Sequence, residues 1–239
     1  MRIIYTILLT LIIMTFSSCV EDYKSGKKDD LTTSHEYPSA TNPYNYDEPL
    51  VKASDTSVRS RWQKPEDVLK RIGNLNKKVV ADIGAGTGYF SIYFMTYPTE
   101  KVIAIDIDQS QLDTLQFNLD AATGMKDSIR KKLEARLVPT DNPKLKDEEV
   151  DVVFISNTYA YLENKVDYLK IVKKGMKPKG RICIVDYKMK KLPPAYGPPV
   201  EERVPLYVVE NQLEEAGFKH LYTDDQLLDF QYLVIAEKE

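Results

Sequence analysis

The residues from 82 to 88 combine an acid with three glycines, in the order Asp-Ile-Gly-Ala-Gly-Thr-Gly. A second acid, Asp106, closes the next apolar run. Glycine lets a backbone adopt positive φ and pass close to a ligand, and the N–H groups of a turn that opens a helix attract a carboxylate or phosphate. An acid at the end of the following strand suits the two hydroxyls of a ribose. Together these residues predict a turn that binds a nucleoside-containing ligand.

Two ligands compete for this turn, a nicotinamide dinucleotide and S-adenosylmethionine (SAM). The dinucleotide motif Gly-x-Gly-x-x-Gly needs a small sixth residue, but that position is Tyr89 counted from Gly84 and Ser91 counted from Gly86. Asp82 stands directly before the turn, where it would repel a pyrophosphate. SAM carries a sulfonium and an ammonium and no phosphate, so an acid favours it. The charges therefore favour SAM over NAD.

The elements that position this turn alternate between strands and helices from about residue 60 onward. Nearly continuous apolar strands indicate a parallel sheet with helices on both faces. Right-handed crossovers then predict a doubly wound, Rossmann-like α/β fold with a mostly parallel seven-stranded sheet, whose ligands bind beyond the carboxyl ends of the strands. The expected strands are 78–83, 101–106, 133–138, 151–156, 181–186, 219–222 and 231–236, and the expected helices begin near residues 65, 89, 110, 165 and 208.

Residues 59–239 resemble the class I SAM-dependent methyltransferases, which implies SAM as the cofactor and methyl transfer as the reaction. The resemblance implies that the glycine turn holds the methionine part of SAM and that Asp106 binds its ribose. Asp141, after the third strand, would reach the adenine amino group, and the residues after the fourth strand would line the transfer site. The cofactor-binding residues expected from this resemblance are Asp82, Gly84, Ala85, Gly86, Gly88, Asp106, Ile107, Asp141 and Ser156.

The acceptor site is expected from the segments after the fourth and fifth strands. Asn157, Tyr159 and Tyr161 are the candidates to line it, and the long loop 188–199 is placed to cover it. Residues 61–65, Arg-Trp-Gln-Lys-Pro, resemble a subgroup of bacterial methyltransferases of unassigned substrate. That subgroup would carry a histidine pair where this chain has Tyr-Ala-Tyr, so no general base is assigned. We expect the acceptor to be a small molecule.

Structural roles remain open for several of these residues. Asp82 would suit a cap of the glycine turn, and Asp106 or its neighbour Asp108 would suit a cap of the loop. Asp141 also has the character of a turn residue. Trp62 fits a core anchor as well as a substrate platform, and the two candidate tyrosines fit packing as well as the site.

Composition excludes some functions. The chain has 239 residues and a net charge of -3, which gives no case for nucleic-acid binding, because contacts to phosphate need a basic face. Its cysteines are Cys19 and Cys183 and its histidines are His35 and His220, which provide no zinc cluster at ligand spacing. Cys183 lies within an apolar run and is expected to be a small buried side chain, and His220 is expected to be structural.

The first residues have the character of a targeting segment. Arg2 precedes an apolar run over 3–16 that is too short to span a bilayer and suits a secretory signal. The run ends in Phe-Ser-Ser before Cys19, which resembles the lipobox of bacterial lipoproteins. We expect a signal peptide over 1–18, lipidation of Cys19, a polar disordered tether over 19–55 and a methyltransferase domain over 56–239. A buried N-terminal helix is the structural alternative.

These segments predict a lipid-anchored protein of the bacterial envelope, or a cytoplasmic one if the leader is not used. Because SAM is made in the cytosol, a leader that exports the chain conflicts with catalysis. A non-catalytic envelope-anchored module, which binds SAM or a nucleoside or serves as a scaffold, is therefore an open alternative. An NAD-dependent oxidoreductase is a further one.

Overall fold

The computed structural model describes residues 56–122, 125–193 and 196–239. The expected signal peptide, the lipidated Cys19 and the tether over 19–55 lie outside these residues. Within the described ranges, no helix combines the length and the apolar character that crossing a bilayer would require.

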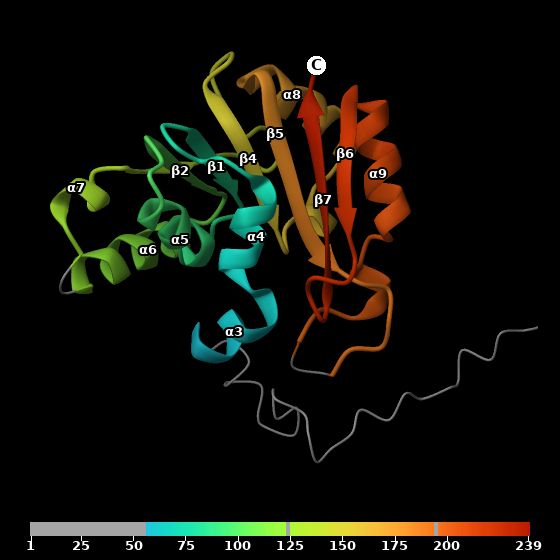
Figure 1. Cartoon of the computed structure of the whole chain (residues 1–239), viewed down its shortest axis with the longest axis horizontal. Coiled ribbons are helices and arrows are strands. Elements are labelled where there is room, and N and C mark those ends of the chain that lie inside the picture. Colours follow the sequence, from blue (N-terminus) through green and yellow to red (C-terminus); the bar gives the residue numbers. More distant parts are fainter. Residues whose placement is uncertain (1–55, 123–124, 194–195) are drawn as a thin grey trace, which may run out of the picture. The chain divides into compact units, whose positions relative to one another are not determined.

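The described residues form a seven-stranded sheet in the order β3-β2-β1-β4-β5-β7-β6. β1 to β5 are parallel, and β7 runs antiparallel between β5 and β6 (Figure 1). This confirms the predicted Rossmann-like α/β fold. The strands are β1 (Val79–Ile83), β2 (Lys101–Asp106), β3 (Leu133–Leu137), β4 (Val150–Ser156), β5 (Met176–Tyr187), β6 (Phe218–Asp224) and β7 (Gln231–Lys238).

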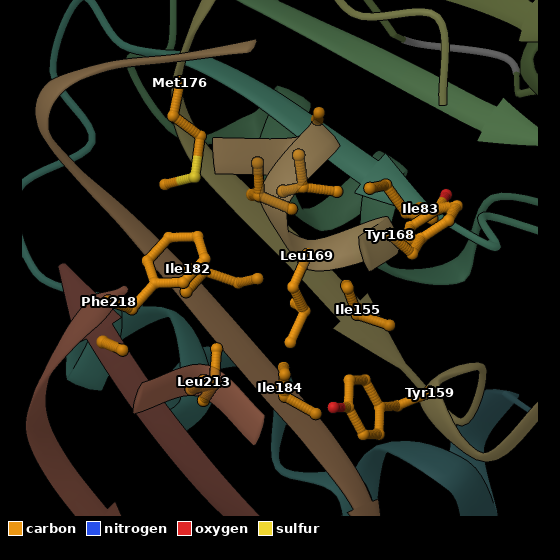
Figure 2. Packing of buried hydrophobic residues seen from close by; sticks show 14 of the residues in the cluster. Ile83, Ile155, Tyr159, Tyr168, Leu169, Met176, Ile182, Ile184, Leu213 and Phe218 are labelled. Atoms are coloured by element: carbon orange, nitrogen blue, oxygen red, sulfur yellow. The ribbon is translucent and has the colours of Figure 1, made fainter. Parts of the chain in front are cut away.

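Helices cover both faces of the sheet, and each face has its own apolar core. Leu169 of α8 and Leu213 of α9 pack on one face, against Ile182 and Ile184 of β5 (Figure 2). α4, α5 and α6 pack on the other. The helices are α3 (Thr56–Gln63), α4 (Pro65–Ile72), α5 (Tyr89–Thr96), α6 (Gln109–Ala121), α7 (Asp127–Arg130), α8 (Lys165–Gly175) and α9 (Leu206–Glu215), with short 3-10 turns η1 (Tyr159–Tyr161) and η2 (Val200–Glu202).

Several elements differ from the sequence-based expectation: α3, α7 and the two 3-10 turns were not expected, and β5 is longer than expected. α3 was not expected, because its eight residues show no apolar period; Trp62 packs against residues far along the chain instead. Lys64 then takes a left-handed φ of 43° before Pro65 begins α4. A residue before proline disfavours the right-handed helical region, so α3 ends before Lys64. β5 begins at Met176 rather than at 181, and its pairing with β4 shifts register between Val150 and Val152.

Candidate active site

The glycine turn leaves β1 at the carboxyl end of the parallel strands and leads into α5. The N–H groups of Gly84 and Ala85 donate to the carbonyl of Ile105, at 2.8 and 3.0 Å, which fixes the turn to β2. Gly84 and Gly88 have φ of 74° and 86°. A Cβ on Gly84 would lie 2.0 Å from the Oγ1 of Thr158, and one on Gly88 would lie 2.0 Å from a methyl of Leu115. Both positions therefore require glycine.

Asp82 places a buried carboxylate below this turn. It lies in β1 with 2% of its surface exposed, and the Ser91 hydroxyl donates to it at 2.6 Å. Burial raises the pKa of Asp82 to about 6, while the hydrogen bond from Ser91 and the charge of Arg59 act in the opposite direction. Near neutral pH the group is thus an ionised acid that a cation from a ligand would stabilise.

Asp106 ends β2 beside the turn. Its Oδ2 accepts from the Gly86 N–H at 2.7 Å, and its Oδ1 accepts from the Asp108 N–H at 3.0 Å. The helix cap belongs to Asp108, whose carboxylate accepts from the N–H of Ser110 at 2.8 Å. Ile107, between the two acids, is 59% exposed. The carboxylate of Asp106 is therefore oriented by the glycine turn itself and retains free acceptor positions.

The end of β4 brings two more candidates to the same end of the sheet. Ser156 is buried, and within the described residues its hydroxyl has no hydrogen-bond partner. Asn157 has a left-handed φ of 58°, and its N–H donates to the Val185 carbonyl at 2.9 Å. Its side-chain oxygen accepts from the amide of Gln231 in β7. An orphaned hydroxyl and a strained asparagine at a strand end are typical of functional sites.

The remaining candidates have diverse surroundings. Tyr159 is fully buried in the core shown in Figure 2, and its hydroxyl donates to Gln212 at 2.7 Å. Tyr161 is 62% exposed. Asp141 is exposed in the turn after β3, and it raises the pKa of Tyr168 as a smaller contribution beside that of burial. The structure thus gives Tyr159 a packing role, whereas Tyr161 and Asp141 remain accessible.

Loop 188–199 packs on α3. Trp62 is 4% exposed, with its ring 5.9 Å from that of Tyr196 in the loop and 5.7 Å from that of Phe230. Arg203 holds the loop by donating to the carbonyls of Lys188, Lys190 and Pro198, at 2.6 to 2.9 Å. Trp62 is therefore a core anchor that fixes the loop over this end of the sheet.

Four polar residues at this end were not predicted from the sequence. The Arg59 guanidinium lies over the Tyr89 ring, 4.0 Å from its centroid. The buried amides of Gln63 and Gln231 pair at 3.1 Å. Asp186, 1% exposed, accepts from the N–H groups of Tyr187 and Ala160, and burial raises its pKa. The sequence signals for them were the place of Gln63 in the segment 61–65 and the polarity of Gln231 and Asp186 at the ends of apolar strands.

Cys183 and His220, the cysteine and the histidine among the described residues, are not part of this site. Cys183 is fully buried in β5, and burial raises the pKa of its thiol. This confirms that Cys183 is a small buried side chain. His220 is exposed and its ring contacts the Thr223 hydroxyl at 2.8 Å. The described residues contain no group of three or more His, Cys, Asp or Glu side chains that would hold a metal ion.

Comparison with known proteins identifies the family. A family model for the methyltransferase domain matches residues 74–224. The chain belongs to this methyltransferase family. A solved SAM-dependent methyltransferase from Aquifex aeolicus is 26% identical, with a TM-score of 0.69 over 80% of this chain and 97% of that one. SAM is accordingly the cofactor of this methyltransferase.

Curated relatives are more distant. A tRNA U34 carboxymethyltransferase from Aliarcobacter butzleri is 22% identical over 71% of this chain and 57% of its own length. A phosphoethanolamine N-methyltransferase from Zea mays is 25% identical over 67% of this chain and 31% of its own. The methyltransferase described here thus spans less than two thirds of either relative.

The residues at the glycine turn fit SAM. The buried acid Asp82 suits a ligand that brings positive charge, and the carboxylate of Asp106 suits hydroxyl donors. The orphaned hydroxyl of Ser156 lies at the end of the neighbouring strand. Nothing in this set requires phosphate, which agrees with a cofactor that carries none.

Proposed function

We propose that this methyltransferase transfers the methyl group of SAM to a small-molecule acceptor at the carboxyl end of β4 and β5. The observation that carries the proposal is the position of Asp82 and Asp106 on either side of the glycine turn, one of them buried with a raised pKa. We assign to the cofactor Asp82, Asp106 and the turn, together with Ile107, Ser156 and the more exposed Asp141.

The acceptor side is proposed from Asn157, Tyr161 and loop 188–199. Asn157 is held in place by Gln231, and the loop is held by Arg203. Because Tyr159 is fully buried, we leave it out of the acceptor site. A small molecule is supported by the net charge of -3, which disfavours tRNA, and by the name of the Zea mays relative, which specifies phosphoethanolamine for that enzyme.

Methyl transfer from SAM requires no covalent bond between the protein and the methyl group. SAM supplies an electrophilic methyl group and its own thioether leaving group. When SAM is bound, its methyl group would pass to a lone pair of the acceptor and the thioether would leave. The residues of the chain align the two reactants and exclude water. A general base is needed only where the acceptor must lose a proton.

Calorimetric titration of the full chain with SAM, and separately with NADH, tests this proposal. Micromolar affinity for SAM without affinity for NADH is the expected result. Release of S-adenosylhomocysteine in the presence of pooled small metabolites, but not of tRNA, would then identify the acceptor class. A folded chain that binds no SAM would favour a non-catalytic anchored module, and binding of NADH instead would favour an oxidoreductase.

We also propose that the protein is lipid-anchored in the bacterial envelope through Cys19. Support comes from the sequence: Arg2, the apolar run over 3–16 and the small residues directly before Cys19. Labelling of the native host with a palmitate analogue should mark the wild-type protein and leave Cys19→Ala unmarked. Absence of label on the wild type would contradict the anchor and leave the methyltransferase assignment intact.

A further inference from the structure

Arg59 brings a positive charge to the glycine turn from outside the strand–helix repeat. It lies on α3, ahead of the first strand. Its guanidinium lies over the ring of Tyr89, 4.0 Å from the centroid, and Tyr89 is the first residue of α5 directly after the turn. In Figure 1, α3 lies beyond the end of the sheet at which β5 finishes. A cationic side chain distant in sequence therefore lies beside the end of the cofactor turn, where α5 begins.

The side chain of Arg59 is held from one end. Its Nε donates to the Oε1 of Gln63, whose Nε2 donates to Gln231 at 3.1 Å, and Gln231 donates in turn to Asn157. Within the described part of the chain, the two terminal nitrogens of Arg59 donate no hydrogen bond. The guanidinium is thus oriented by protein while its donor fork is left for another acceptor.

The partly buried Arg59 and the buried Asp82 carry opposite charges that influence each other without direct contact. Burial is the main cause that lowers the pKa of Arg59, and it is opposed by Tyr89, by Tyr187 and, to a smaller extent, by Asp82. The positive charge of Arg59 likewise opposes the effect of burial on Asp82. No ion pair joins the two groups among the described residues, although each influences the other. A buried charge without a close ionic partner is costly, so a ligand that brings an ammonium to Asp82 and a carboxylate to Arg59 would be stabilised there.

We propose that Arg59 binds the carboxylate of the amino-acid end of SAM, while Asp82 binds its ammonium. This inference rests on the proposed function and names the residue that holds the cofactor's negative charge. An amino acid placed between the two side chains would give an alternating row of charges, from carboxylate to ammonium to carboxylate to guanidinium, with no net charge added. The planar fork of arginine matches a carboxylate with two parallel hydrogen bonds, which a lysine does not provide.

The arrangement makes α3 part of the cofactor site. Gln63 joins α3 to the beginning of β7 and, through it, to Asn157 on the proposed acceptor side. Binding of the carboxylate by Arg59 would therefore order the same amide chain that holds Asn157. The protein should then distinguish SAM from analogues that keep the adenosine, the sulfonium and the amine but lack the carboxylate.

Decarboxylated SAM is the probe that tests this assignment. The full-length wild type should bind SAM about tenfold or more tightly than decarboxylated SAM, as is typical of charge-assisted hydrogen bonds. Arg59→Gln should bind SAM about tenfold more weakly than the wild type does. Its affinity for decarboxylated SAM should be unchanged, so the preference for SAM should be lost. Arg59→Lys should keep part of the preference, because it keeps the charge and loses the fork.

Arg61→Gln is the matched control, because Arg61 is an exposed arginine of the same helix. It should bind both ligands as the wild type does. If Arg59→Gln weakens both ligands equally, or leaves the preference for SAM intact, the assignment of Arg59 is overturned. Unchanged binding of decarboxylated SAM also reports that the variant is folded. If the wild type binds neither ligand, SAM is not the cofactor. That result would contradict the proposed function and not the assignment of Arg59 alone.

Discussion

An aspartate near each end of the parallel strands has a shifted pKa, but the two shifts have opposite directions. At the amino end, Asp151 of β4 forms ion pairs with Lys78 at 3.1 Å and Lys177 at 2.8 Å, and it also accepts from the N–H of Val79. Burial would raise its pKa, but these partners outweigh burial and hold the pKa below its usual range. At the carboxyl end, Asp82 has no cationic partner in contact among the described residues, and burial raises its pKa to about 6.

The paired charges at the amino end favour a role in stability, whereas the unpaired charge at the carboxyl end favours a role in ligand binding. A pocket also opens at the amino end, where Lys78, Asp151, Lys179 and Arg181 line it. Lys179 pairs with Glu237 at 3.6 Å, and Arg181 donates to the Ile72 carbonyl at 2.8 Å. Charges that are already paired have little to gain from a ligand, whereas an unpaired buried charge has much to gain. The carboxyl end is therefore the end at which a ligand is expected.

The largest expected effect comes from removing the unpaired charge. Asp82→Asn keeps the size of the side chain and should weaken SAM binding by at least about 30-fold, the cost of truncating one partner of a buried charge pair. Calorimetric titration of both proteins measures it. Asp151→Asn, at the paired end, should leave SAM affinity unchanged. Equal losses for the two variants would remove the distinction between the ends.

The pH dependence of binding should report the same carboxylate. Its pKa is raised to about 6 in the ligand-free protein, and only the ionised form attracts an ammonium. SAM affinity should therefore fall as the pH drops through this pKa, by about fivefold between pH 6 and pH 5. Affinities measured across this range for Asp82→Asn should show no such fall. A fall that persists in the variant would point to another group.

Asp106→Ala should have a smaller effect on the cofactor. It removes the proposed acceptor for the ribose hydroxyls and the partner of the Gly86 N–H. We expect at least a several-fold loss of SAM affinity, and about the same loss for adenosine as a competing ligand. Asp108→Ala is the control, because that residue caps α6. Unchanged affinity in Asp106→Ala would contradict the ribose assignment.

The smallest effect concerns stability, and its sign should differ between the two ends. Asp151→Asn should lower the free energy of unfolding by about 1 kcal/mol, because it breaks ion pairs with partly exposed lysines. The raised pKa of Asp82 means that its ionised form costs stability above the folded pKa, so Asp82→Asn should stabilise the ligand-free protein at pH 8. Urea unfolding at pH 8 compares them. A loss of stability in both variants would show that Asp82 is already compensated.

Several parts of the fold and the site were predictable because their signals are local. The alternation of apolar strands and helices gave the sheet, and glycines at fixed spacing gave the turn with its acids at 82 and 106. Tyr159 was open between packing and the site, because three residues of a 3-10 turn do not reveal which side chain faces the core. The structure places it against Gln212, 53 residues away.

Sequence by itself determined the class of fold, the cofactor turn and the charge that selects SAM over a dinucleotide, because each depends on neighbouring residues and on the period of apolar side chains. Only the tertiary structure decided which distant polar groups meet at that turn. Arg59 lies over the ring of Tyr89 directly after the cofactor turn, and Gln63 pairs with Gln231 at a separation of 168 residues. Amide and guanidinium pairings carry no periodic signal, so they are fixed only when the sheet brings its strand ends together.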